Sequence, residues 1–221
     1  MKFSAVPKFG VALLVLTWCA PGQTPASESK GMPARATAGD YQAQGKAGAV
    51  TIAADSTGHS VTTPEGQFTT EDYISLEVAL FGDAGARATI SAADFSLKIN
   101  GKKQPLPSQG YLLILKSLKD PEWIPPDIGQ NEPKSKGGIT GGGGGGGGGG
   151  NDPPPAPPKM PLELQRAMAQ KVQRATLPEG DRALPVAGLL FFAYRGKPDG
   201  IKSMELVYSG AAGKASLELQ P

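Results

Sequence analysis

The chain has few of the side chains that most often carry chemistry. Its 221 residues include one cysteine, Cys19, and one histidine, His59. Transition-metal sites are built mainly from thiolate, imidazole and carboxylate ligands, so the common types of site lack ligands here. His59 stands in a polar stretch, where a solvated loop residue is favoured over a metal ligand or a general base. We therefore expect no cofactor and no metal site.

An excess of charge of one sign is lacking as well. The 22 Lys and Arg residues against 20 Asp and Glu residues give a formal net charge of +2. Domains that bind nucleic acid through phosphate contacts have strongly basic surfaces, so this balance argues against a nucleic-acid partner. No apolar run reaches the about 20 residues that a membrane-spanning helix needs, so we expect no transmembrane segment in the mature chain.

The N-terminus has the features of an export signal. Lys2 and Lys8 form a basic region, and an apolar run of about twelve residues follows it. We expect cleavage after Ala26, with Gly22 as the alternative, and hence a periplasmic or extracellular protein. Removal of residues 1–26 leaves 20 basic and 20 acidic side chains, so the mature chain is formally neutral.

Cys19 has two interpretations. In the first it is the acylated cysteine of a lipobox, which would anchor the protein to a membrane. However, Trp18 lies immediately before it, where a lipobox needs a small residue. In the second, preferred interpretation Cys19 is removed with the signal peptide, and the mature chain has no thiol for a disulfide or a nucleophile.

Glycine and proline are abundant, at 31 and 21 residues, but the excess is local. Residues 141–150 are consecutive glycines, and a proline-rich stretch follows them. Polyglycine has no side chains to bury and much backbone entropy to lose, so residues 125–160 are predicted to be a disordered loop. Residues 27–47 are small and polar, and are predicted to be a flexible lead-in. The folded domain is then residues 48–221, interrupted by this loop.

Alternation of apolar and polar residues predicts most of the strands. In residues 73–81 the side chains of Ile74, Leu76, Val78 and Leu80 fall on one face. The dipeptide 100–101, Asn-Gly, predicts a type I′ hairpin turn. Residues 111–115 fit either a strand or a short helix. Strands are predicted at residues 50–52, 73–81, 95–100, 187–194, 202–208 and 214–219, and an amphipathic helix with Leu164, Met168, Val172 and Ala175 on one face at 161–175.

This order of elements predicts an all-β fold, an antiparallel β-sandwich of about seven strands with one short helix. The motifs Y-I-S-L-E-V-A-L (73–80), D-F-S-L-K-I-N-G-K (94–102), V-A-G-L-L-F-F-A-Y (186–194) and S-M-E-L-V-Y (203–208) resemble those of secreted bacterial immunoglobulin-like domains of unknown function. The resemblance implies an immunoglobulin-like sandwich, an extracytoplasmic location and a recognition role. It brings no functional residues with it.

Two functions from different classes fit the sequence. The first is a non-enzymatic accessory or recognition domain that binds a protein or glycan partner in the cell envelope. Tyr111, Trp123 and Tyr194 lie near predicted loops and form its candidate recognition patch, although they also fit as caps on the ends of a small core. The alternative is a carbohydrate-active or other hydrolytic module. It would need facing carboxylates from loops, for which the candidates are Glu71, Asp72, Asp94, Asp120, Glu122, Glu179 and Asp181.

Overall fold

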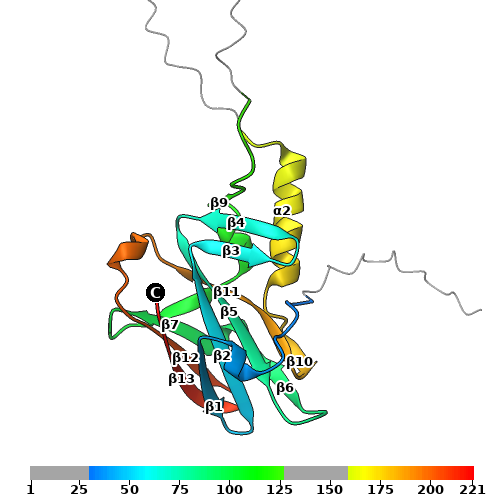
Figure 1. The fold of residues 1–221 in the computed structure, drawn as a ribbon, viewed down its shortest axis with the longest axis vertical. Coiled ribbons are helices and arrows are strands. Elements are labelled where there is room, and N and C mark those ends of the chain that lie inside the picture. Colours follow the sequence, from blue (N-terminus) through cyan, green and yellow to red (C-terminus); the bar gives the residue numbers. More distant parts are fainter. Residues whose placement is uncertain (1–29, 127–158) are drawn as a thin grey trace, which may run out of the picture.

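The computed structural model describes residues 30–126 and 159–221 (Figure 1). Most of this part is antiparallel β-structure, as predicted, and its main sheet has the strand order β1-β2-β5-β11-β8-β7-β12-β13. The signal peptide and most of the loop predicted at 125–160 lie outside the described residues. The strands of the main sheet are β1 (Ala43–Ala47), β2 (Val50–Gly58), β5 (Tyr73–Phe81), β7 (Phe95–Ile99), β8 (Leu106–Gln109), β11 (Val186–Ala193), β12 (Met204–Gly210) and β13 (Gly213–Leu219).

Smaller elements flank the main sheet. One small sheet contains β3 (Ser60–Thr63), β4 (Gly66–Thr70) and β9 (Leu118–Lys119), and another contains β6 (Arg87–Ile90) and β10 (Gly180–Ala183). The helices are α1 (Tyr111–Ile114), α2 (Leu162–Ala175) and the short 3-10 turns η1 (Ala38–Asp40), η2 (Ala92–Asp94) and η3 (Pro198–Gly200). Within the described ranges, no helix combines the length and the apolar character that crossing a membrane requires.

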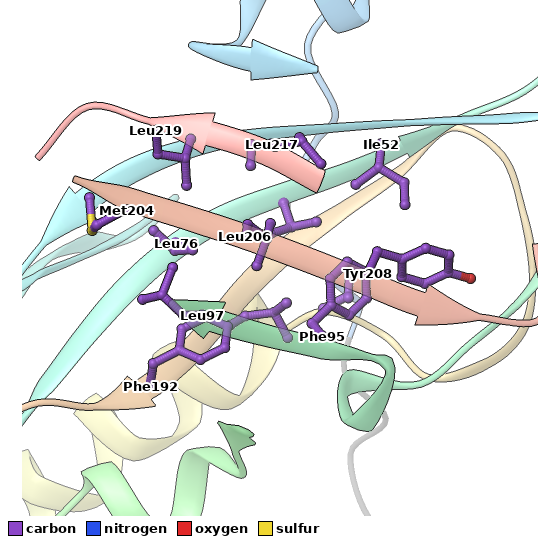
Figure 2. Close-up of a cluster of buried hydrophobic side chains, with 14 of the residues drawn as sticks. Ile52, Leu76, Phe95, Leu97, Phe192, Met204, Leu206, Tyr208, Leu217 and Leu219 are labelled. Atoms are coloured by element: carbon purple, nitrogen blue, oxygen red, sulfur yellow. The ribbon is translucent and has the colours of Figure 1, made fainter. Parts of the chain in front are cut away.

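The main core lies between the two halves of the main sheet. Figure 2 shows side chains that converge on it from β2, β5, β7, β11, β12 and β13. Full burial of a large apolar side chain stabilises a fold by about 1.5–3 kcal/mol, so this cluster is the principal source of stability. Its largest members include Ile52, Leu76, Phe95, Leu97, Phe192, Met204, Leu206 and Tyr208.

Strand β5 is central to the sheet and is buried along most of its length. It pairs with β2 on one side and with β11 on the other. The predicted alternation is confirmed, since Ile74, Leu76, Val78 and Leu80 all belong to the main core. The opposite face is buried too, including the carboxylate-bearing Glu77. A chain segment must therefore cover the outer side of the sheet.

The N-terminal segment provides this cover, which differs from the flexible lead-in predicted for residues 27–47. Residues 30–47 contain η1 and β1, and Tyr41 is only 6% exposed. The Arg35 guanidinium lies 4.3 Å from the centroid of the Tyr41 ring and forms ion pairs with Asp55 and Glu77. The small residues of this segment, whose composition predicts flexibility, instead allow the segment to pack closely on the sheet.

The two edges of the main sheet approach each other. A Cβ atom at Gly45 of β1 would stand 3.4 Å from the Cδ1 of Leu217 on β13, which is van der Waals contact. Beyond these strands the side-chain amide of Gln42 donates a hydrogen bond to the backbone carbonyl of Gln220. The sheet thus curls until its edge strands cover one another, which protects edges that would otherwise be open to pairing with other chains.

Most of the predicted elements are present. The strands predicted from residue 50 onward are found in β2, β5, β7, β11, β12 and β13, and the predicted helix is α2. Asn100 and Gly101 both have positive φ, at 53° and 65°, as the predicted hairpin turn requires. Residues 111–114 form a helix, which resolves the ambiguity there. The predicted total of about seven strands and one helix is too low, because the described residues also form α1 and short strands of five residues or fewer, namely β1, β3, β4, β6, β8, β9 and β10.

Candidate functional site

Helix α2 stands beside β3 and β4, at one end of the molecule in Figure 1. Its buried face consists of Met168, Val172 and Ala175, three of the four residues on the predicted apolar stripe. These side chains share a second core cluster with Val61, Phe68, Ile114, Leu118, Leu189 and Phe191. Helix α2 and the short α1 are therefore both fixed to the outer side of the sheet by one face each.

The large exposed apolar side chains of the described residues belong to this region. Among the described residues, the large apolar side chains that are highly exposed are Leu112 (65%), Leu113 (54%), Ile124 (84%) and Leu162 (59%). All four lie on α1, on residues 115–126 or on α2, and we call these segments together the helical end. Scattered exposed apolar residues are ordinary, whereas a cluster of them marks an interaction site.

The first of two hollows at the helical end lies between the beginning of α2 and the chain that follows α1. We call it the α2 groove. It has a volume of about 800 Å³, within the range of ligand-binding clefts. Its apolar lining includes Leu115, Leu118, Trp123, Met160, Leu162 and Met168.

The charged residues that line the α2 groove are mostly basic. They are Lys116, Lys119, Lys159 and Arg166, with Asp120 as the acid. Lys119 pairs with Glu71 and lowers the pKa of that carboxyl by donating a hydrogen bond to it. In the part of the chain that the structure describes, Lys116, Lys159 and Arg166 form no ion pair. The groove therefore combines an apolar lining with an electropositive rim.

The second hollow lies beyond α1, toward the end of α2, and we call it the β11 hollow. Strand β8 pairs with β11 only at Phe191 and Phe192, and a space of about 730 Å³ lies beside Leu189 and Leu190, where β11 is not paired with β8. Leu112, Leu113, Leu177, Leu189 and Leu190 line it, together with one cation and one anion, Arg182 and Glu179.

The charges of the β11 hollow are held by the surrounding backbone. The Arg182 Nε donates to the Glu179 carbonyl over 2.8 Å, and the Glu179 carboxylate accepts a hydrogen bond from the amide of Ala92, also at 2.8 Å. Since these two charges are opposite, the β11 hollow has no excess charge of either sign. It differs in this from the α2 groove.

The three aromatic residues of the predicted recognition patch occupy three different places. Tyr111 lines the β11 hollow and Trp123 lines the α2 groove, so both lie at the helical end. Tyr194 directly follows β11 and packs beside His59, with ring centroids 6.1 Å apart. The predicted patch is therefore divided, although two of its members border the hollows.

The apolar members of the helical end were not predicted as site residues. Leu112 and Leu113 belong to a run that reads equally well as a buried element. Leu162 offered a usable signal, because it lies off the stripe formed by Met168, Val172 and Ala175 and so must face away from the core.

His59 has a packing role. Its Nδ1 atom lies 2.9 Å from the carbonyl oxygen of Thr70, and its ring contacts that of Tyr194. Within residues 30–126 and 159–221, no three His, Asp or Glu side chains group closely enough to hold a metal ion. Cys19, the candidate for lipidation, lies outside the described residues.

The candidate carboxylates for hydrolysis do not meet in either hollow. The α2 groove is lined by Asp120 and the β11 hollow by Glu179, one acid in each. Burial, with a contribution from the charge of Glu179, raises the pKa of Asp94, which does not line the hollow. Several of the other candidates form ion pairs, namely Glu71 with Lys119, Asp72 with Arg195 and Asp181 with Arg87.

The resemblance of the strand motifs to secreted immunoglobulin-like domains stays a prediction. Comparison of the chain with protein-family models, with curated proteins and with solved structures found no match.

Proposed function

We propose that this protein is an exported, non-enzymatic recognition domain that binds a segment of a partner protein at the helical end. The observation that carries the proposal is that the exposed side chains of Leu112 and Leu113 line one apolar hollow and that of Leu162 lines the other. Exposure of such side chains to water is unfavourable, and a partner that covers them recovers the free energy of their burial.

A protein segment suits the α2 groove better than a glycan does. Trp, Met and Arg are the residue types enriched at protein–protein interfaces, and the groove contains Trp123, Met160 and Arg166. A glycan presents many hydroxyl groups, and each one that is buried without a hydrogen bond carries a desolvation cost. The apolar lining of the groove offers few partners for such groups.

The rest of the fold serves as the framework that holds the helical end. The two halves of the main sheet contribute facing side chains to one core, which supports a sandwich of the immunoglobulin-like type. The leader supports export to the periplasm or the exterior, with a lipid anchor at Cys19 as the alternative. A hydrolytic function has less support, because neither hollow at the helical end brings two candidate acids together.

Photo-crosslinking in the producing cells tests the proposal. A photoreactive residue in place of Leu162 should give a discrete adduct with one protein. The matched control places the same residue at Lys214, which is exposed on β13, and should give no such adduct. Equal labelling at both positions would count against a recognition surface at the helical end.

A further inference from the structure

We infer that the partner segment is acidic, carries large apolar side chains, and docks in the α2 groove rather than in the β11 hollow. The inference rests on the proposed function and adds to it the chemistry of the partner. It follows from a difference in charge between two hollows of similar size and similar apolar lining.

Charge complementarity selects the α2 groove. Four cations and one anion line it, and Lys116, Lys159 and Arg166 have no ion pair in the described part of the chain. A cleft with an excess of charge of one sign and with apolar walls concentrates the electric field and attracts the opposite charge. An acidic segment would neutralise these cations when its apolar side chains enter the groove.

The β11 hollow gives no such preference. Its single cation, Arg182, lies with Glu179, so an acidic segment would meet a repulsive carboxylate as well as an attractive guanidinium. An acidic partner therefore gains a net electrostatic attraction in the α2 groove that the β11 hollow does not provide.

The lining of the α2 groove favours a protein segment over an anionic membrane surface. Met168 is buried, and Trp123 and Met160 are partly buried, so these three side chains form a recess, with the exposed Leu162 at its rim. Side chains of a peptide can enter such a recess, whereas membrane-bound proteins insert apolar groups that project. The two methionines can adapt to the shape of the side chains that enter, because methionine is flexible and polarisable.

Selection of short random peptides displayed on phage, with the full chain as bait, tests the inference. We expect the enriched peptides to be net negative and to contain at least two large apolar residues. Their affinity should decrease as salt increases, because exposed charges are screened beyond about 10 Å at 0.1 M ionic strength.

Charge-reversal variants locate the binding site. The triple variant Lys116→Glu, Lys159→Glu and Arg166→Glu should weaken binding of the selected peptides about tenfold or more. The matched control is Lys46→Glu, Lys102→Glu and Lys214→Glu, which changes the net charge equally at exposed positions outside both hollows of the helical end. This control should bind nearly as well as the unaltered chain.

Contrary outcomes separate the inference from the proposed function. Enriched peptides that are neutral or basic, or that bind both triple variants equally, would overturn the acidic partner but leave recognition by apolar contacts in place. Absence of any enriched peptide would also overturn the inference. So would a shift of Trp123 fluorescence with phosphatidylglycerol vesicles but with no peptide, since it would identify a membrane as the partner. This measurement uses the chain from Ser27 onward, in which Trp123 is the one tryptophan. The crosslink at Leu162 uses no selected peptide, so a discrete adduct there would keep the proposed function even where the enriched peptides overturn the acidic partner.

Discussion

The backbone of Leu177 crosses directly over Gly188, and a residue with a side chain would not fit at position 188. A Cβ atom at Gly188 would stand 2.4 Å from both the N and the Cα of Leu177. At this crossing the amide of Leu177 donates to the carbonyl of Leu189, so the chain that leaves α2 bonds to the edge of β11. This contact fixes the end of α2, and with it one wall of the β11 hollow.

Gly188→Ala should destabilise the protein because the added methyl group meets backbone that cannot move without breaking this hydrogen bond. We expect the free energy of unfolding, measured by urea denaturation, to fall by about 1–3 kcal/mol. Gly110→Ala is the matched control, since Gly110 has open space around its Cβ position and should change stability by less than about 0.5 kcal/mol. Equal effects of the two substitutions would show that the crossing is not tightly packed.

Arg35→Gln should reveal whether the N-terminal segment is part of the folded domain. Asp55 and Glu77 face each other across β2 and β5, and Arg35 pairs with both. Loss of Arg35 leaves two carboxylates opposed, one of them buried. Because Arg35 is itself partly exposed, we expect a loss of about 2 kcal/mol in the free energy of unfolding, less than for a fully buried pair.

A control variant and a double variant show whether the loss of stability comes from the Arg35 ion pairs. Lys46→Gln, at an exposed position on β1, should have little effect. Adding Glu77→Gln to Arg35→Gln should restore part of the lost stability, because it removes the unpaired buried charge. If Arg35→Gln and Lys46→Gln had the same small effect, residues 30–42 would not be docked on the sheet.

Ser75→Ala should stabilise the protein. The Ser75 hydroxyl is buried on β5 and has no hydrogen-bond partner within the described residues. Removing a buried, unsatisfied hydroxyl should raise the free energy of unfolding by about 1 kcal/mol. Thr70→Val offers the opposite case, because the Thr70 hydroxyl is hydrogen-bonded to that of Ser117 at 2.7 Å, and thermal denaturation should show its melting temperature reduced. A clear loss of stability in Ser75→Ala would mean that this hydroxyl is bonded.

Several of the predicted strands show an alternation of apolar and polar residues in their own sequence, and the strand at 187–194 shows a continuous apolar run. In β5 and β7 every second side chain enters the main core, so the pattern is visible in the sequence. Strand β1 was missed because its residues are small and polar and its position depends on pairing with β2 and packing against β13. Such contacts join distant parts of the chain, and local composition does not report them.

The candidate site was predicted only in part, for a similar reason. The sequence indicates Trp123 as an aromatic residue near a loop, and Trp123 lines the α2 groove. The groove itself forms because residues 115–125 pack beside the beginning of α2, about forty residues further along the chain. Tyr194 shares with Trp123 only its aromatic character and its place near a loop, and the fold places it beside His59 instead.

The mature protein should begin at Ser27. The basic and apolar regions of the leader and the small residue Ala26 support cleavage at this point. Intact mass spectrometry of the protein purified from the cells that produce it measures the mature N-terminus directly. A chain that begins at a lipid-modified Cys19 would establish the lipoprotein alternative, and a chain that retains Met1 would contradict export.

Recognition at the helical end is the central claim, and crosslinking from Leu162 tests it most directly. Its side chain is 59% exposed and lines the α2 groove, so a photoreactive residue at this position would lie against any bound segment. We predict one discrete protein adduct from position 162, reduced by the charge reversal at Lys116, Lys159 and Arg166, and none from position 214. Absence of an adduct from position 162, or the same adducts from position 214, would contradict the claim.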